Sequence, residues 1–150
     1  MERLAATRDE LVAMVGGVDA ETLARRPAPE AWAGVEVVCH LRDLEESFHD
    51  RLTLILLAAV EPRVPTTHPG RWAIERQYLR QDARAAAATF AARRGETLAL
   101  LTELPSAAWE RAGRQADSRG RRTVDDFLTV MAWHDENHLA QLRRALAGRP

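Results

Sequence analysis

Residues 131–142 read MAWHDENHLAQL, and this stretch places two histidines one helical turn apart. On a helix, the side chains of His134 and His138 stack on one face, within reach of a single ion. The apolar residues around them keep a helical period: Val124, Phe127, Leu128, Met131, Leu139, Leu142 and Leu146. At about 100° per residue, both histidines lie on the margin of that stripe. Two imidazoles at the margin of a core form part of a metal site that needs a third ligand.

Asp135, next to the first histidine, points near the middle of the same stripe by the same angular count. A bare carboxylate there is unfavourable, so Asp135 needs a cationic partner or an imidazole N–H to accept. The second arrangement is typical of residues that orient metal ligands. H-x3-H pairs also occur by chance in helical chains, where the histidines bond to carbonyls or water.

The composition is that of an ordinary globular chain of 150 residues, with 46% hydrophobic and 29% charged residues. We expect one domain, residues 1–150. The net charge of −1 predicts neither a nucleic-acid partner nor a membrane partner. Cys39 is the only cysteine, and the N-terminus lacks an apolar leader, so we expect a cytoplasmic protein.

Four long helices and no strand are predicted from periodicity, glycine and proline. In chain order we expect a helix over 2–15, a short turn of helix and a loop over 19–32, a helix over 34–60, a non-helical connection over 61–73, a helix over 74–104, a turn over 105–109, an arginine-rich loop over 111–122, and a helix that begins at Thr123 and ends at Gly148. Thr123 and Asp126 are expected to form a capping box.

The second long helix carries the candidate for the third ligand. Its apolar stripe is Val37, Leu41, Leu44, Phe48, Leu52 and Ile55. His40 lies on one margin of this stripe and is the natural third ligand. His49 lies on the other margin, and we interpret it as a residue at the surface or edge of the bundle.

The connection over 61–73 is long enough to follow a helix from end to end, since 13 extended residues span about 40 Å. It therefore permits helices 34–60 and 74–104 to run parallel. His40 is level with His134 and His138 only if helices 34–60 and 123–148 run antiparallel. We therefore predict an all-α fold, a four-helix bundle with up-down-down-up topology.

These features resemble the DinB/YfiT-like superfamily. The resemblance rests on Trp32 before the second helix, on CHLRDLE with His40, on the long crossover, and on TVDDFLTVMAWHDENHLAQL near the C-terminus. It implies a four-helix bundle, often a homodimer, with a divalent metal bound by His40, His134 and His138. Some relatives are thiol S-transferases that use a low-molecular-weight thiol, so the resemblance implies a small-molecule electrophile as substrate.

Three neutral imidazoles leave open positions on a metal, as in catalytic sites. The nucleophile would be a metal-bound water or thiolate, with a water pKa of about 7, and no side chain is assigned as catalytic. Zinc or nickel is expected first, with iron or manganese as other candidates. Asp135 would orient a histidine or form an internal ion pair. Gln141 would hold the bound water or a ligand, and Asp43 has two interpretations, a residue behind the ligands or a solvated surface charge.

The expected site lies near the end of the bundle where helix 34–60 begins. Trp32, Trp72 and Tyr78 are candidates for the rim of its opening, with His68 as a loop residue and not a fourth ligand. The arginine-rich segment is placed at the far end, as a solvated loop in which Arg119 and Arg121 play no part.

Two alternatives compete with a metal-dependent transferase or hydrolase. One is a ferritin-like di-iron site, since Glu46 to His49 is an E-x-x-H and Asp135 to His138 a D-x-x-H. The other is a non-catalytic, metal-stabilised bundle that binds a ligand or a partner.

Overall fold

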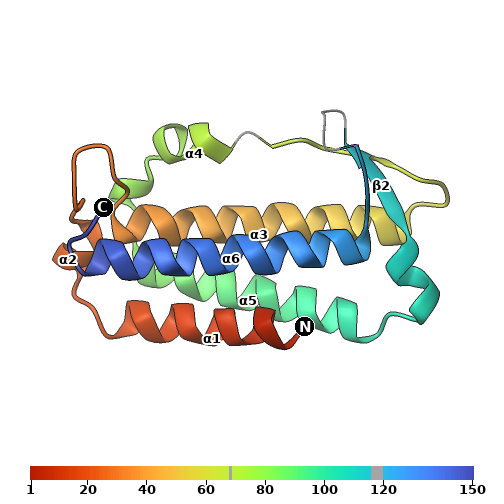
Figure 1. Cartoon of the computed structure of the whole chain (residues 1–150), viewed down its shortest axis with the longest axis horizontal. Coiled ribbons are helices and arrows are strands. Elements are labelled where there is room, and N and C mark those ends of the chain that lie inside the picture. The colour runs from red at the N-terminus through yellow and green to blue at the C-terminus, as the bar shows by residue number, and fades with distance from the viewer. Residues whose placement is uncertain (68, 116–119) are drawn as a thin grey trace.

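Four long helices pack side by side in the computed structural model, which describes residues 1–67, 69–115 and 120–150 (Figure 1). They are α1 (Glu2–Gly16), α3 (Gly34–Leu57), α5 (Ala83–Thr102) and α6 (Val124–Leu146). The shorter elements are α2 (Ala20–Ala24), β1 (Arg63–Val64), α4 (Pro69–Glu75), η1 (Tyr78–Arg80), η2 (Ser106–Glu110), β2 (Ala112–Gln115) and β3 (Arg121–Thr123). Nowhere in these ranges does a helix combine the length and the apolar character needed to cross a membrane. His68 and Arg119 lie outside the described residues.

Side-chain caps determine where several helices begin. Thr123 accepts a hydrogen bond from the Asp126 backbone N–H, and the Asp126 carboxylate accepts one from the Thr123 N–H, which confirms the predicted capping box. Asp82 accepts bonds from the first backbone N–H groups of α5. The predicted helix over 74–104 therefore began too early. Gln77, in a left-handed conformation with φ 50°, separates α4 from the chain that leads into α5.

Contacts along the helices give their relative directions. From Glu46 with Arg93 to His49 with Thr97, partners advance together along α3 and α5, so these two helices run parallel. The rings of Phe48 and Phe127 meet, whereas the earlier His40 meets the later His138, so α3 and α6 run antiparallel. In Figure 1 the crossover that contains α4 runs along the bundle and connects the end of α3 with the start of α5.

The predicted apolar stripes lie in the core, with few exceptions. All six predicted stripe residues of α3 are buried, and so are Leu4, Leu11 and Val15 of α1. Val12, also predicted to face inward, is 44% exposed, because it follows Leu11 by one residue and so turns about 100° away from it. The helix α3 ends at Leu57, three residues before the predicted end.

Two corrections concern the connections. The segment 61–73 was predicted to contain no helix, yet its last five residues lie in α4, because Pro69 is tolerated in the first turn of a helix. The chain was also predicted to contain no strand, whereas β1 pairs in parallel with β2, and β2 pairs in antiparallel with β3. Strands of two to four residues are too short to show a period-2 pattern.

The small sheet packs closely against α3. A Cβ atom on Gly113 would lie 2.1 Å from Val64 Cγ2 and 2.9 Å from Ile55 Cγ1, so only glycine fits there. Residues 112–115 and 121–123, most of which belong to the segment predicted as an arginine-rich loop, therefore form a strand pair held against the bundle. Gln115 and Arg122 of this pair reach the groove between α3 and α6.

Candidate metal centre

His40 from α3 and His134 and His138 from α6 form one cluster, in which each residue offers a ligand nitrogen within 4.8 Å of the others. His40 Nε2 and His134 Nε2 are 3.2 Å apart. The ring centroids of His138 lie 4.5 Å from His40 and 4.3 Å from His134. Within the described ranges this is the one group of three or more potential ligands that converge in this way. The structure thus brings together the three residues that the sequence indicated.

Burial keeps the imidazoles of His40 and His138 uncharged near neutral pH. Desolvation, followed by the positive charges of His138 and His134, lowers the pKa of His40 to about 3. Desolvation, followed by the charge of His134, lowers the pKa of His138 to about 4. Neutral imidazole is the form that binds a metal ion. His40 and His138 are therefore ready to act as ligands without first losing protons.

Gln141 orients one ligand. Its Oε1 lies 2.8 Å from His138 Nδ1, and because an amide oxygen only accepts, the Nδ1–H group donates. The Nε2 lone pair of His138 then faces the cluster. This is the usual arrangement behind a metal-bound histidine, although the sequence had suggested contact with water or a ligand.

The distances fit a divalent ion. Two nitrogen ligands at about 2.05 Å from a tetrahedral ion lie about 3.3 Å from each other. The observed separation of 3.2 Å between the Nε2 atoms of His40 and His134 agrees with this value. Both residues also have a buried Nδ1 atom with no hydrogen-bond partner among the described residues. The donor set consists of imidazoles alone, which suits zinc, nickel, copper and iron.

A buried ion-pair network lies directly behind His134. Arg94 Nη1 donates to Asp135 Oδ2 at 2.7 Å, and Arg94 Nη2 donates to Glu45 Oε2 at 2.6 Å. Asp135 Oδ1 is 3.8 Å from His134 Nδ1. Asp135 therefore has the cationic partner that its inward position required. One arginine and two carboxylates carry a formal charge of −1, which a cation held by the histidines would offset.

Arg94 was not identified from the sequence, although a signal was present. The buried residues of α5 include Ala87, Phe90, Arg94, Thr97 and Leu101, so Arg94 occupies one position of a regular apolar stripe. A charged residue in such a position requires a buried partner. The alanine run around Arg94 favours a helix but does not indicate such a partner.

Asp43 belongs to a second buried polar group, which lies beside α4. It accepts hydrogen bonds from Arg42, Arg76 and the Tyr78 hydroxyl, at 2.6–2.7 Å. Burial opposes ionisation, but these three donors lower the pKa of Asp43. The carboxylate holds the end of the crossover on α3, and the interpretation as a solvated surface charge is wrong.

None of the three rim candidates lines the cavity that reaches the histidines. Tyr78 is fully buried, since its hydroxyl is bound to Asp43 and its ring lies in the core. Trp72 packs on the bundle with the Arg76 guanidinium 4.3 Å from its ring centroid, and it lines a hollow beside Asp43 and Arg51. Neither residue lines the cavity that reaches the histidines.

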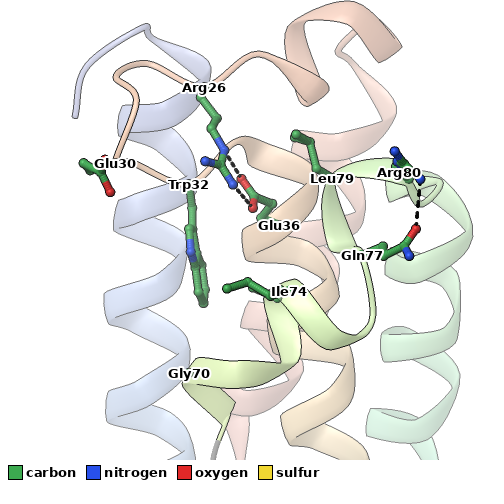
Figure 2. A pocket seen from close by; sticks show the side chains of 10 residues that line it. Arg26, Glu30, Trp32, Glu36, Gly70, Ile74, Gln77, Leu79 and Arg80 are labelled. Atoms are coloured by element: carbon green, nitrogen blue, oxygen red, sulfur yellow. Dashed lines mark hydrogen bonds and ion pairs between the residues drawn. The ribbon is translucent and has the colours of Figure 1, made fainter.

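Trp32 does contact the cluster. Its ring centroid lies 5.1 Å from that of His40 and 6.4 Å from that of His138, stacked on the latter at 19°. Trp32 also lines a separate cavity of about 460 Å³, which Figure 2 shows. In this cavity the indole lies beside Ile74 and the Arg26–Glu36 ion pair. Trp32 thus covers one side of the histidines with an apolar ring.

The cavity that reaches the histidines opens in another direction. It has a volume of about 320 Å³ and is lined by His40, His134, apolar side chains of α3 and α6, Thr67 and Pro69 of the crossover, and Gln115 and Arg122 of the strand pair. The arginine-rich segment was predicted to lie far from the site, because of its distance from His134 along the helix. That prediction is wrong, since Gln115 and Arg122 line this cavity. Pairing of β2 with β1 brings the segment back over the groove.

The di-iron alternative finds no support in this geometry. Glu46 is about half exposed and forms an ion pair with Arg93, and His49 bonds to Thr97. Neither residue joins the cluster of His40, His134 and His138.

A helical bundle with three converging histidines between two antiparallel helices defines a class of candidate metal proteins. A family model for the DinB superfamily matches residues 3–142, and the chain belongs to this superfamily. A solved structure of YfiT from Bacillus subtilis is similar, with a TM-score of 0.87 and 21% sequence identity over 96% of this chain and 82% of that one. It is described as a probable metal-dependent hydrolase with an unusual four-helix bundle topology. No curated protein matches the chain.

Proposed function

We propose that this protein is a metal-dependent enzyme that binds one divalent ion through His40, His134 and His138 and acts on a small electrophile. The observation that carries the proposal is the distance of 3.2 Å between two ligand nitrogens, with the third histidine in contact with both. The neighbouring cavity of about 320 Å³ supports a small substrate, since it lies at the lower end of the range for ligand sites. YfiT supports a metal-dependent reaction by analogy of fold.

A bound divalent ion would supply Lewis acidity, which favours the deprotonated form of a water or thiol nucleophile near neutral pH. The protein's own residues prepare the site. Gln141 fixes the orientation of the His138 ring. Arg94 fixes the Asp135 carboxylate, whose negative charge lies near His134 and favours a cation there. Trp32 limits the access of water from one side.

The proposal has two versions, which differ in the nucleophile that attacks the electrophile. In the first, a low-molecular-weight thiol attacks the electrophile and the enzyme is a thiol S-transferase, in keeping with the family resemblance. In the second, water attacks and the enzyme is a hydrolase, as suggested for YfiT. Both versions use the same three ligands and the same cavity. Zinc or nickel is the proposed ion, with iron and manganese next.

The remaining parts of the proposal concern architecture and location. We propose the up-down-down-up helix order, which the parallel contacts of α3 with α5 and the antiparallel contacts of α3 with α6 support. We also propose a homodimer in the cytoplasm, without nucleic-acid or membrane partners. The family resemblance suggests the homodimer, whereas the net charge of −1 and the free Cys39 support the rest of this part.

The test begins with metal content. Purified protein should contain, or take up, one equivalent of zinc or nickel, and the variants His134→Ala and His138→Ala should lose it. His49→Ala is the matched control, because His49 bonds to Thr97 outside the cluster and should leave the metal in place. Stoichiometric metal in a His134→Ala/His138→Ala double variant would refute the assignment.

Turnover assays distinguish the thiol S-transferase from the hydrolase. The metal-loaded protein is incubated with monobromobimane and a low-molecular-weight thiol, and separately with p-nitrophenyl acetate in water. Thiol conjugation lost in His134→Ala identifies the transferase, whereas ester cleavage alone identifies the hydrolase. Metal binding without either activity, over a wider panel of electrophiles and esters, would favour the non-catalytic bundle.

A further inference from the structure

Positively charged and hydrogen-bond-donating side chains line part of the cavity beside the histidines. Arg122 lines it from β3, Gln115 from β2, and Arg51 from α3. The Arg51 guanidinium donates to Thr67 Oγ1 at 2.8 Å, which holds its charge beside the crossover. Among the described residues that line the cavity, none carries a carboxylate.

The pairing of β2 with β3 explains why Arg122 faces inward while its neighbour faces outward. Arg122 lies opposite Gly113, and Arg121 lies opposite Arg114. Because successive side chains in a strand alternate between faces, Gly113, Gln115 and Arg122 share the face toward the bundle. Arg114 and Arg121 share the other face, where both form ion pairs with Glu61. No such ion pair holds Arg122 in the described parts of the chain.

Gln115 is an unusual lining residue because it is 4% exposed and its Nε2 donor has no partner among the described residues. A buried amide N–H₂ group without an acceptor is unfavourable, because it has lost its hydrogen bonds to water and gained none in return. Such a group is expected where a ligand supplies the acceptor.

Much of the other lining is apolar: Leu44 and Phe48 of α3, and Phe127, Val130 and Trp133 of α6, of which Trp133 is 67% exposed at the surface. The Arg51 guanidinium lies 5.8 Å from the centroid of the Phe48 ring, so cationic and apolar groups are neighbours here. A lining that combines donors with apolar side chains matches an amphipathic ligand. The cavity volume of about 320 Å³ limits that ligand to a small molecule.

We infer that this cavity binds the acidic group of a small amphipathic anion, a carboxylate or phosphate, through Arg122, Arg51 and Gln115, with its apolar part between Phe48 and Trp133. The guanidinium fork of arginine binds either acid in a bidentate way. As a statement about substrate class, this inference rests on the proposed function, since it places the anion next to the three histidines. As a statement about binding, it is independent of the metal.

The experiment measures binding to metal-free protein, so that direct ligation to a metal ion is excluded. The probes are 4-fluorobenzoate, 4-fluorophenyl phosphate and uncharged 4-fluorobenzamide, each titrated by ¹⁹F NMR. We expect at least one anion to bind about tenfold more tightly than the amide, which corresponds to one charge-assisted hydrogen bond. The benzoate and phosphate arms decide which acid is preferred.

Arg122→Gln should reduce that preference to about twofold or less, whereas Arg121→Gln, with the same loss of charge one residue away, should leave it unchanged. Gln115→Met is a second variant that removes a donor at similar side-chain length and should lower the preference severalfold. Circular dichroism and urea unfolding check the fold of each variant. Equal binding of anions and amide to the wild-type protein, or equal losses in the Arg121 and Arg122 variants, would overturn the inference.

Zinc binding by equilibrium dialysis, measured on the same preparations, keeps the two proposals separate. Zinc binding with no preference for anions would refute the inference alone. Preference for anions without zinc binding would support the anion site and refute the proposed metal-dependent function.

Discussion

Replacing Arg94 by methionine tests the buried charge network behind His134. The side chains of Arg94, Glu45 and Asp135 are 1%, 0% and 3% exposed, so water cannot solvate the two carboxylates once the guanidinium is gone. Removing one partner of a buried ion pair costs about 3–5 kcal/mol, and two carboxylates are left here. We therefore expect Arg94→Met to lower the free energy of unfolding by about 4 kcal/mol or more. For a chain of this length, that corresponds to a decrease in Tm on the order of 10 °C.

Arg93→Met is the matched control, one residue away on the same helix. Arg93 is 30% exposed, and its partners Glu46 and Glu96 are 48% and 58% exposed, so each pair contributes only about 0.2–1 kcal/mol. The assay is urea unfolding of metal-free protein at pH 7. A difference between the two variants of less than about 0.5 kcal/mol would refute the charge argument. Replacing Arg94, Glu45 and Asp135 together by apolar residues should recover most of the loss, because no unpaired charge remains.

Three further predictions follow from the site and its scaffold. The pKa values of His40 and His138 are depressed to about 3 and 4, below the unfolded value near 6.5, so the unfolded chain binds more protons below pH 6.5. As the pH falls from about 6 to 4.5, each of these two histidines should therefore lower the free energy of unfolding of metal-free protein by up to about 1.4 kcal/mol per pH unit, as measured by urea unfolding. A free energy of unfolding that does not change over this range would contradict the lowered pKa values. Gly113→Ala should destabilise the protein by about 1–3 kcal/mol, because the new Cβ clashes with the core. Gly95→Ala, at a position within α5 where a Cβ meets no other atom, should stabilise it by up to about 1 kcal/mol. Thermal unfolding of both variants measures these changes. Gln141→Leu should weaken zinc binding about 10-fold or more, since His138 loses its acceptor, and unchanged affinity in equilibrium dialysis would rule that role out.

The candidate ligands were predictable because helical geometry converts local spacing into position. His134 and His138 are four residues apart, and His40 lies beside an apolar stripe, so each could be assigned to the margin of a buried face before any tertiary contact was known. The same count identified Asp135 as an inward carboxylate, and it is buried. Its partner was not predictable, because Arg94 lies 41 residues away on another helix.

The opening of the site was misplaced for a different reason. The prediction used the distance from Thr123 to His134 along α6, which is correct for the helix but does not describe the segment before it. Residues 63–64 pair with residues 114–115 across about fifty positions of sequence. No local pattern encodes that contact, and it brings Gln115 and Arg122 to the cavity.

The sequence by itself determined the four long helices, their buried faces and the three histidines at the margins of those faces, because a period of 3.6 residues is a local property of the chain. Only the tertiary structure decided which cation neutralises Asp135, that Tyr78 is buried and bound to Asp43, and from which side a ligand reaches His40 and His134. These features depend on contacts between residues far apart in sequence. Such contacts are selected by packing and charge pairing in the complete fold, and two- to four-residue strands leave no periodic trace of them.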